Sequence, residues 1–237
     1  MEFNVLDKGF VRLVETMGND FSPVQSARVS FGKGLTTKER DIKLINYLME
    51  HKHHTPFEHI VFKFHLKLPI FVMRQLVRHR IASINERSGR YTEFKTEWYI
   101  PDRVRVPDSK NKQGSIKTDN EEMNAKGIKI IKEELEYIYK KYQELLSMGV
   151  AKELARIILP TSMYTECYWT INCRSLMNFL NLRADSHAQY EIQQYAIAIA
   201  EIFKKHYPNV YNAFLTYEYR GDILNRRDEE NGIEETY

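Results

Sequence analysis

Four arginines and a histidine lie within fourteen residues of the chain, from Arg78 to Tyr91, together with a single glutamate. Guanidinium groups bind phosphate in a bidentate way, and Ser83, Asn85 and Ser88 add short hydrogen-bonding side chains between these cations. A solvated basic surface remains the alternative, although such a surface needs no concentration of short polar groups. The segment therefore indicates a site for a small anionic phosphate ester.

A second unusual segment, residues 171–187, places amides and cations among leucine and phenylalanine. Its polar residues include Asn172, Arg174, Asn178, Asn181, Arg183 and His187. The apolar neighbours suggest that some of these groups are buried and need partners, which the edge of a heterocycle would supply. A solvated helix surface is the alternative. Arg156 is likewise a single cation in an apolar stretch, where a structural ion pair is the alternative to a ligand.

Histidines are concentrated in residues 51–59, which raises the question of a metal site. Zinc-binding helices present two histidines four residues apart in the form H-E-x-x-H, and the segment lacks that spacing. Pro56 also interrupts any helix that would align His54 with Glu58. We therefore predict no metal site and interpret the segment as a turn that leads into a strand.

The overall composition limits the possible partners. The 237 residues include 35 lysines and arginines against 32 aspartates and glutamates, a balance that excludes a protein coating nucleic acid or an anionic membrane. The longest apolar runs, such as residues 196–200, are too short to span a bilayer, and no secretory signal is visible. Two cysteines cannot form a disulfide scaffold. We expect a soluble, cytoplasmic protein without nucleic-acid or membrane partners.

The polar segments must be positioned by regular elements. Residues 59–68 are the clearest strand, because apolar residues alternate there with mostly polar ones. The apolar face of this strand consists of Ile60, Phe62, Phe64, Leu66 and Leu68. Pro69 ends the strand and can begin a helix that runs to about Arg80. Earlier elements are a strand at 10–16, a helix at 22–28 capped by Ser22, and a helix opened by Thr36-x-x-Glu39 that continues to about residue 51.

The second half of the chain is predicted to be helical. Its longest helix has apolar residues three and four positions apart and ends at Gly149. These apolar positions are Ile128, Ile131, Leu135, Ile138, Tyr142 and Leu145. Further helices are predicted at 151–158, 173–182, 187–206 and 209–217, and an exposed, mobile loop at 100–120. Strands come early and helices late, so we predict an α+β fold with an antiparallel sheet, one catalytic domain at 1–220 and a polar tail at 221–237.

The fourteen-residue segment resembles a known signature. Its pattern, Arg-His-Arg-x-x-Ser-x-Asn-x-x-Ser-x-Arg-Tyr, is similar to that of the flavin-dependent thymidylate synthases, and all eight defined residues are present. Supporting matches are Thr55-Pro56-Phe57-Glu58-His59 upstream, and Arg174-Ser175-Leu176-Met177-Asn178-Phe179, Leu182-Arg183 and His187 downstream. The resemblance covers roughly residues 20–98 and 150–220, which is most of a single domain.

The resemblance implies an enzyme that methylates dUMP to dTMP. Its carbon donor would be 5,10-methylenetetrahydrofolate, its bound hydride carrier FAD and its reductant NADPH, in a homotetramer with flavin sites between subunits. The family's positions around FAD correspond to Thr55, Glu58, Arg78, His79, Arg80, Glu86, Asn172, Arg174 and Asn178. Those around dUMP correspond to Gln75, Arg78, Glu86, Arg87, Ser88, Gly89, Arg90, Arg156 and Arg183, contributed by more than one chain.

Three of the matched positions have more particular implied roles. Arg183 matches the position thought to polarise uracil and to favour ionisation at its N3. His53 and His187 match positions close to the flavin and to the path of the folate.

The implied chemistry needs no enzyme nucleophile. Hydride delivery and electrostatic activation of uracil can replace attack by a cysteine thiolate. Cys167 and Cys173 lie outside the signature, and Ser88 has no recognisable Ser-His-Asp partners, so we expect Ser88 to be a ligand contact.

Two alternatives from other classes remain. One is a nucleotide- or RNA-binding module that uses the Arg78–Arg90 cluster, which predicts steep salt dependence and no bound chromophore. The other is a metal-dependent hydrolase that uses His53, His54 and His59, which predicts bound zinc. A yellow purified protein with flavin absorbance would exclude both.

Overall fold

The computed structural model describes residues 1–32, 34–94, 96–109, 111 and 114–225. Within these residues the chain forms a single α+β domain around a five-stranded antiparallel sheet with the order β1-β2-β3-β7-β4. The strands of this sheet are β1 (Glu2–Val5), β2 (Gly9–Met17), β3 (Val61–Pro69), β4 (Ser83–Glu86) and β7 (Tyr164–Asn172). A separate hairpin consists of β5 (Arg105–Pro107) and β6 (Ser115–Lys117).

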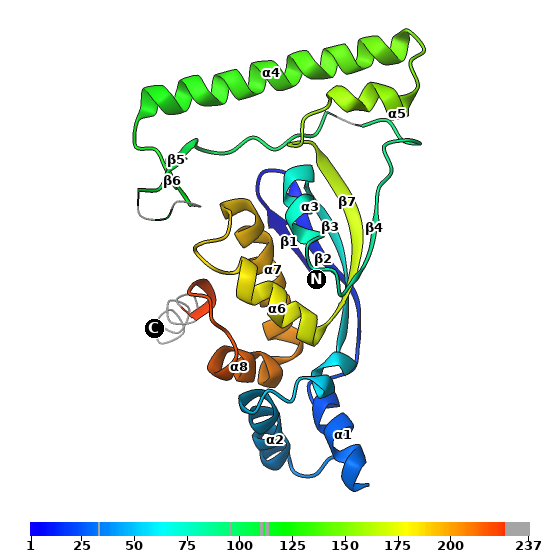
Figure 1. The fold of residues 1–237 in the computed structure, drawn as a ribbon, viewed down its shortest axis with the longest axis vertical. Helices are drawn as coiled ribbons and strands as arrows, with labels where there is room; N and C mark the ends of the chain where they lie inside the picture. The colour runs from blue at the N-terminus through cyan, green and yellow to red at the C-terminus, as the bar shows by residue number, and fades with distance from the viewer. Residues whose placement is uncertain (33, 95, 110, 112–113, 226–237) are drawn as a thin grey trace.

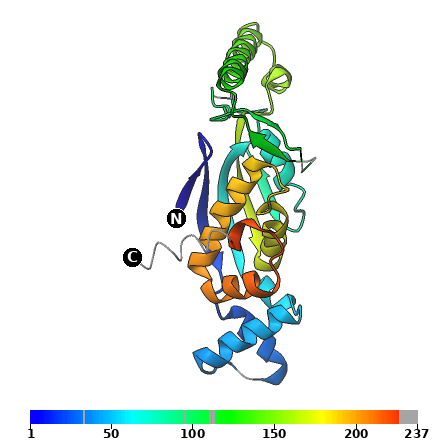
Figure 2. The same cartoon turned by 90° about the vertical axis from the view of Figure 1, so that its left-hand side faces the viewer.

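Helices cover one face of the sheet and extend the molecule at both ends (Figure 1, Figure 2). The α-helices are α1 (Ser22–Arg28), α2 (Lys38–Glu50), α3 (Ile70–Leu76), α4 (Glu121–Ser147), α5 (Lys152–Ala155), α6 (Cys173–Arg183), α7 (Tyr190–His206) and α8 (Pro208–Tyr217). Short 3₁₀ turns are η1 (Val29–Phe31), η2 (Thr55–His59) and η3 (Arg156–Ile158). Helix α4 lies across one end and helices α1 and α2 lie at the other, so the sheet with α6 and α7 forms the middle.

The predicted strand at 59–68 is confirmed as β3, and its alternation positions the core. Its inward side chains Phe62, Phe64, Leu66 and Leu68 are each at most 1% exposed. Burial of one such side chain contributes about 1.5–3 kcal/mol. The ring of Phe64 lies 6.0 Å from that of Trp169 on β7, which in turn meets Phe179 of α6 edge-on at 5.2 Å. This aromatic contact fixes α6 on the covered face of the sheet.

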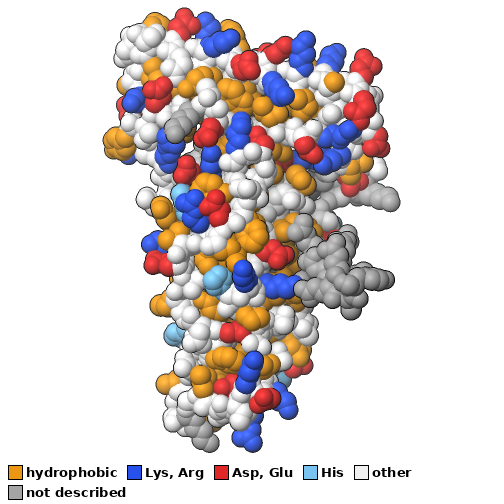
Figure 3. Space-filling view, turned by 180° about the vertical axis from the view of Figure 1, so that it is seen from behind, with side chains coloured by type: hydrophobic (Ala, Val, Ile, Leu, Met, Phe, Trp, Pro, Cys, Tyr) orange, Lys and Arg blue, Asp and Glu red, His pale blue; other side chains and the backbone are white. Residues whose placement is uncertain are grey.

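The opposite face of the sheet, which we call the open face, carries polar side chains. Its cross-strand pairs are Lys63–Glu15 at 2.8 Å, His65–Glu166 at 3.0 Å and, with a loop residue, Lys67–Glu97 at 2.9 Å. Seen from behind, the molecule shows charged side chains of both signs interspersed with hydrophobic ones (Figure 3). The two faces of the sheet therefore differ in chemistry, as the alternation in β3 requires.

Strand β7 corrects the expectation that strands occur only early in the chain. It pairs with β3 over the whole length of both strands. Cys167, Trp169 and Ile171 are buried on the covered face, whereas Glu166 and Tyr168 alternate with them on the open face. The sequence prediction also missed β1 and β4, which are edge strands of four residues each. Such short strands carry too few residues for an alternating pattern to be recognised.

Several helix boundaries differ from their predictions. Helix α3 ends at Leu76 rather than near Arg80, and the His79 backbone N–H donates to the Leu76 carbonyl at 3.0 Å in the turn that follows. Helix α7 begins at Tyr190 rather than 187. The predicted helix at 151–158 is confirmed as two short pieces, α5 and η3. These ends matter because Arg78–Arg80 lie in the loop between α3 and β4 rather than on a helix.

The caps of the first helices are displaced by one residue. Thr37, not Thr36, caps α2 and accepts from the Arg40 backbone N–H. The Thr36 hydroxyl instead donates to Asp41 at 2.8 Å. Ser22 lies inside the first turn of α1 rather than at its cap.

Residues 100–120, predicted as an exposed, mobile loop, contain the β5–β6 hairpin, which the sequence prediction did not include. Helix α4 begins at Glu121, earlier than its apolar pattern, where the Asn120 side chain accepts from the Met123 backbone N–H. In the predicted tail, Leu224 is 2% exposed and packs in the core. The rest of that tail, residues 226–237, lies outside the described residues.

Candidate active site

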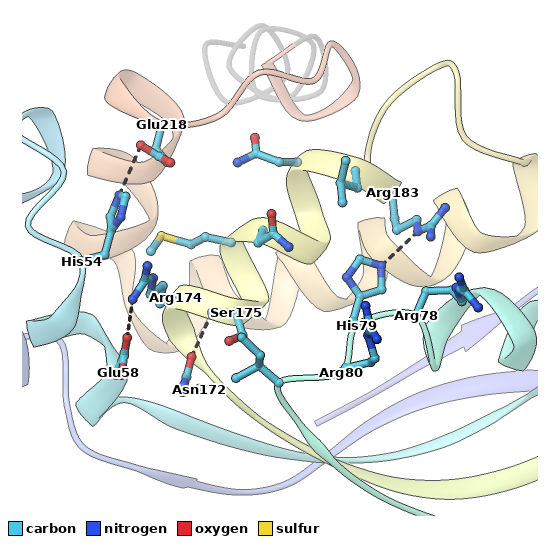
Figure 4. Close-up of a pocket in the computed structure, with 15 residues that line it drawn as sticks. His54, Glu58, Arg78, His79, Arg80, Asn172, Arg174, Ser175, Arg183 and Glu218 are labelled. Atoms are coloured by element: carbon cyan, nitrogen blue, oxygen red, sulfur yellow. Dashed lines mark hydrogen bonds and ion pairs between the residues drawn. The ribbon is translucent and has the colours of Figure 1, made fainter.

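The largest of the described cavities has a volume of about 750 Å³ and lies on the covered side of the sheet (Figure 4). Its walls are the loop after α3, the turn η2, one face of α6 and the end of α8. The lining residues are His54, Glu58, Arg78, His79, Arg80, Ile81, Asn172, Arg174, Ser175, Met177, Asn178, Asn181, Leu182, Arg183 and Glu218. Seven of the predicted FAD residues line this cavity, and so does Arg183. We call this cavity, with its walls, the covered-face site.

Helix α6 supplies one wall because it is amphipathic. Leu176, Phe179 and Leu180 are fully buried against the sheet. Arg174 and Asn178, one turn apart, are exposed toward the cavity. Of the amides set among leucine and phenylalanine, Asn178 therefore faces the cavity and is not buried in the core. At the start of the helix, the Asn172 side chain accepts from the Ser175 backbone N–H at 2.9 Å and caps it.

The turn η2 meets α6 through an ion pair. Arg174 Nη1 donates to Glu58 Oε1 at 2.7 Å, which holds this cation at the cavity wall. His54 Nε2 lies 3.4 Å from Glu218 Oε2 at the end of α8, without the geometry of a hydrogen bond. Sequence reasoning considered His54 only as a metal ligand, and no pattern in the sequence singled out Glu218. In the described part of the chain, no three His, Cys, Asp or Glu side chains group as a metal site.

His79 and Arg183, which both line the cavity, are joined by a hydrogen bond. Arg183 Nε donates to His79 Nε2 at 3.1 Å, which leaves the two terminal nitrogens of the guanidinium available to a ligand. Burial, together with the Arg183 charge, lowers the pKa of His79 to about 4. Burial also lowers the pKa of Arg183, which still remains protonated at every working pH. A neutral His79 is therefore the acceptor that orients a charged Arg183.

This contact predicts how stability depends on pH. Folding lowers the pKa of His79 from 6.5 to about 4, so the unfolded chain binds the proton more readily between these values. The free energy of unfolding should therefore fall as the pH decreases through this window. In His79→Gln, whose amide oxygen can still accept from Arg183, the fall should be smaller. Urea titrations between pH 7 and pH 4.5 measure the difference, with His206→Gln as the exposed control. Equal pH slopes in His79→Gln and wild type would contradict a buried neutral His79.

A second cavity, of about 470 Å³, lies where β4 pairs with β7 and is lined by open-face residues, by β4 with the loop after it, and by Cys167. Its lining residues are His65, Asn85, Glu86, Arg87, Ser88, Glu166, Cys167 and Tyr168. His65 and Tyr168 stack at 4.8 Å on that face. The Glu86 carboxylate accepts from the Thr165 hydroxyl at 2.9 Å, and the Arg87 backbone N–H donates to the Glu166 carbonyl at 2.9 Å. The end of β4 is thereby fixed on β7.

The loop that follows β4 brings the remaining predicted dUMP residues together. An added Cβ on Gly89 would lie 2.2 Å from the Phe94 ring and 3.3 Å from Arg156 Cδ, so only glycine fits here. The Ser88 hydroxyl accepts from the Arg90 backbone N–H at 3.3 Å. We call Ser88, Gly89, Arg90 and Arg156, with the cavity beside them, the open-face site. The two sites share no lining residue.

Some predicted residues lie outside both cavities. Thr55 is exposed at the start of η2, and His53 is exposed just before it, with its ring stacked at 6.2 Å from that of Tyr47. His187 is 73% exposed and pairs with Asp185 at 2.8 Å, at the rim of a neighbouring cavity. Gln75 lies in the last turn of α3 and donates to Gln189 at 2.6 Å. None of the described helices is long and apolar enough to cross a membrane.

Comparison with known proteins identifies the family. The family model described as "Thymidylate synthase complementing protein" matches residues 12–209. The flavin-dependent thymidylate synthase of Kosmotoga olearia is 71% identical over 224 residues, which are 94% of this chain and 97% of that protein. The corresponding protein of Thermosipho africanus is 61% identical, covering 94% of this chain and 98% of that one.

Solved structures agree with these relatives. The UMP/dUMP methylase PolB from Streptomyces cacaoi, bound with 5-Br UMP, matches with a TM-score of 0.82 at 32% identity, covering 92% of this chain and 98% of that chain. The antiparallel sheet and helical layer predicted from the sequence are thus confirmed as a known fold. With the signature residues of Arg78–Tyr91 in place, the chain belongs to the family of flavin-dependent thymidylate synthases.

Proposed function

We propose that this flavin-dependent thymidylate synthase methylates dUMP in sites that two subunits of a homotetramer build together. The carbon donor is 5,10-methylenetetrahydrofolate and the reductant is NADPH. The observation that supports this proposal most directly is the separation of the predicted dUMP residues. Arg78 and Arg183 line the covered-face site, whereas Ser88–Arg90 and Arg156 belong to the open-face site. A single dUMP site that uses both groups of residues would therefore take one group from one subunit and the other group from a neighbouring subunit.

The covered-face site fits FAD by its residue types. Arg78, Arg80 and Arg174 are cations suited to a diphosphate, and Asn172 and Asn178 offer amides suited to the edge of a ring. Ile81 is 74% and Leu182 55% exposed at the cavity wall, although both are apolar. Flat heterocycles pack on such surfaces. FAD bound here would supply a hydride carrier between NADPH and the transferred carbon.

The open-face site fits the phosphate end of dUMP. Arg90 and Arg156 are cations, and Ser88 adds a hydroxyl beside Gly89, where the backbone is free of a side chain. Two solved structures of PolB contain 5-Br UMP and 5-Br dUMP. Both nucleotides share the phosphate and the uracil ring of dUMP, and 5-Br dUMP shares its deoxyribose as well. Arg183 then faces the uracil ring, where its charge favours the ionised form of N3.

The cysteines support chemistry without a thiolate. Cys167 is buried, and burial together with the Glu86 charge raises the pKa of its thiol to about 12. Burial raises the pKa of Cys173 further still, and that residue is fully enclosed. Neither thiol is poised to ionise near neutral pH, so neither is a nucleophile. The relatives are named as synthases and methylases, and the comparisons do not support the alternative RNA-binding module on Arg78–Arg90.

The cofactor is tested by the colour of the purified protein. We expect wild-type protein to be yellow, to lose this colour with NADPH under anaerobic conditions, and to form dTMP. Arg174→Ala removes a charged hydrogen-bond donor from the cavity wall, so FAD affinity should fall by roughly 10–100-fold in equilibrium dialysis. Arg40→Ala, an exposed cation on α2, is the control and should bind FAD normally. A colourless protein that FAD cannot reconstitute would contradict the proposed function.

A further inference from the structure

A series of hydrogen bonds joins the end of α3 to the start of α7 and to the β5–β6 hairpin. Gln75 Nε2 donates to Gln189 Oε1 at 2.6 Å, and Gln189 Nε2 donates to Glu191 Oε2 at 2.8 Å. The other carboxylate oxygen of Glu191 accepts from the Tyr99 hydroxyl at 3.1 Å and from Arg105 Nη2. We call these five residues the Glu191 relay. It connects segments that are up to 114 positions apart in the sequence.

The buried carboxylate determines the direction of each hydrogen bond in the relay. Glu191 is 2% exposed and pairs with Arg105, whose guanidinium lies 4.7 Å above the ring of Tyr190. Burial and the neighbouring carboxylate raise the pKa of Tyr99, so its hydroxyl remains a donor. A carboxylate in this ion pair only accepts hydrogen bonds. The nitrogen of the Gln189 amide must therefore face Glu191, and its oxygen must face Gln75.

The direction of these hydrogen bonds also fixes the orientation of the Gln75 side-chain amide. One N–H of Gln75 is committed to Gln189, so its carbonyl oxygen and its second N–H are directed elsewhere. Gln189 occupies the N-cap position of α7, yet its side chain makes no capping hydrogen bond. Its amide instead forms hydrogen bonds with Glu191 and Gln75. Both features indicate that Gln189 serves the contact with Gln75 rather than the helix.

We propose that Gln189 is a positioning residue for the nucleotide site, which holds the Gln75 amide in the orientation that meets dUMP. This inference rests on the proposed function and on the match of Gln75 to a family position around dUMP. A glutamine side chain loses rotamer freedom when it binds a ligand, and prior immobilisation lowers that cost. Tyr99, Arg105 and Glu191 form the rigid anchor of the relay, because their shared carboxylate is buried and both of its oxygens accept hydrogen bonds.

A double-mutant cycle tests this role. Gln75→Met and Gln189→Met keep the length of each side chain and remove its hydrogen bonds. Each should weaken dUMP binding to the FAD-loaded tetramer by about threefold to tenfold, measured by titration calorimetry. The double variant should bind dUMP as Gln75→Met alone does, because Gln189 acts only through Gln75. At saturating dUMP, kcat should stay within about twofold of wild type in Gln189→Met.

Two controls separate positioning from damage to the fold. Gln25→Met makes the same exchange at an exposed position of α1 and should leave dUMP affinity unchanged. Gln189→Ala, which also loses the contact, should reproduce the effect of Gln189→Met at an unchanged melting temperature. Multiplying effects in the double variant would overturn the inference, as would unchanged dUMP affinity in either single variant. Formation of dTMP by the wild-type protein in the same assay shows separately whether the proposed function stands.

Discussion

Arg183→Ala is expected to lower kcat for dTMP formation by about 10²–10³-fold, the usual effect of losing one charge-stabilising donor. NADPH oxidation by the bound flavin should remain close to the wild-type rate. In the proposed function the Arg183 charge acts on the uracil ring as it becomes electron-rich, whereas hydride transfer from NADPH to the flavin does not involve that ring, so we expect the two activities to separate. Stopped-flow absorbance of the flavin and product analysis of dTMP measure the two steps independently.

The geometry explains why this effect should be large. Arg183 is half-buried, and its Nε is occupied by a neutral His79 at 3.1 Å. The guanidinium therefore keeps a fixed orientation and its full charge in a site where water screens it less than at an open surface. A donor that is already oriented needs no reorganisation when negative charge develops on the substrate.

Two further substitutions define this role of Arg183. Arg183→Lys should recover only part of the activity, because an ammonium group lacks the planar fork that can donate to His79 and to a ligand in one fixed geometry. Arg74→Ala, an exposed cation on α3, should behave as wild type. If Arg183→Ala raised only KM for dUMP and left kcat unchanged, Arg183 would be an ordinary binding residue.

The sequence predicted the parts of the fold that depend on neighbouring residues. The alternation of apolar side chains from Ile60 to Leu68 gave both the existence of β3 and the face that it buries. Residues 164–172 alternate in burial, but the prediction treated the second half of the chain as helical and missed β7. The alternation is weaker there, because Thr165 is polar yet buried and Tyr168 is aromatic yet exposed, and the partner β3 lies about a hundred positions earlier.

The candidate site likewise depends on contacts between distant residues that the sequence alone does not show. The signature identified the residue types from Arg78 to Tyr91, and the structure brings Arg78, His79 and Arg80 to one cavity. The motif itself does not show that β4 runs through its middle. As a result, Ser88 lines a different cavity from Arg78, His79 and Arg80. The contact between His79 and Arg183 joins residues 104 positions apart, so only the fold could reveal it.

Mixing two inactive variants should restore activity if two chains build each site. Arg183→Ala damages the covered-face site and Arg90→Ala the open-face site, so each variant alone should be nearly inactive at low dUMP. In tetramers assembled from equal amounts of both, random pairing should combine the two intact halves at about a quarter of the sites. Activity should therefore rise to about a quarter of the wild-type value, at least tenfold above either variant alone.

The matched control uses two variants in the same half. Arg183→Ala and Arg78→Ala both alter the covered-face site, so no pairing between them contains an intact copy of that half. Their mixture should remain as inactive as the separate variants, although it contains the same proportion of mixed tetramers. If the Arg183→Ala and Arg90→Ala mixture also failed to recover, each site would be built by one chain. Recovery confined to the pair from opposite sites is therefore the result that assigns the two halves of the nucleotide site to different subunits.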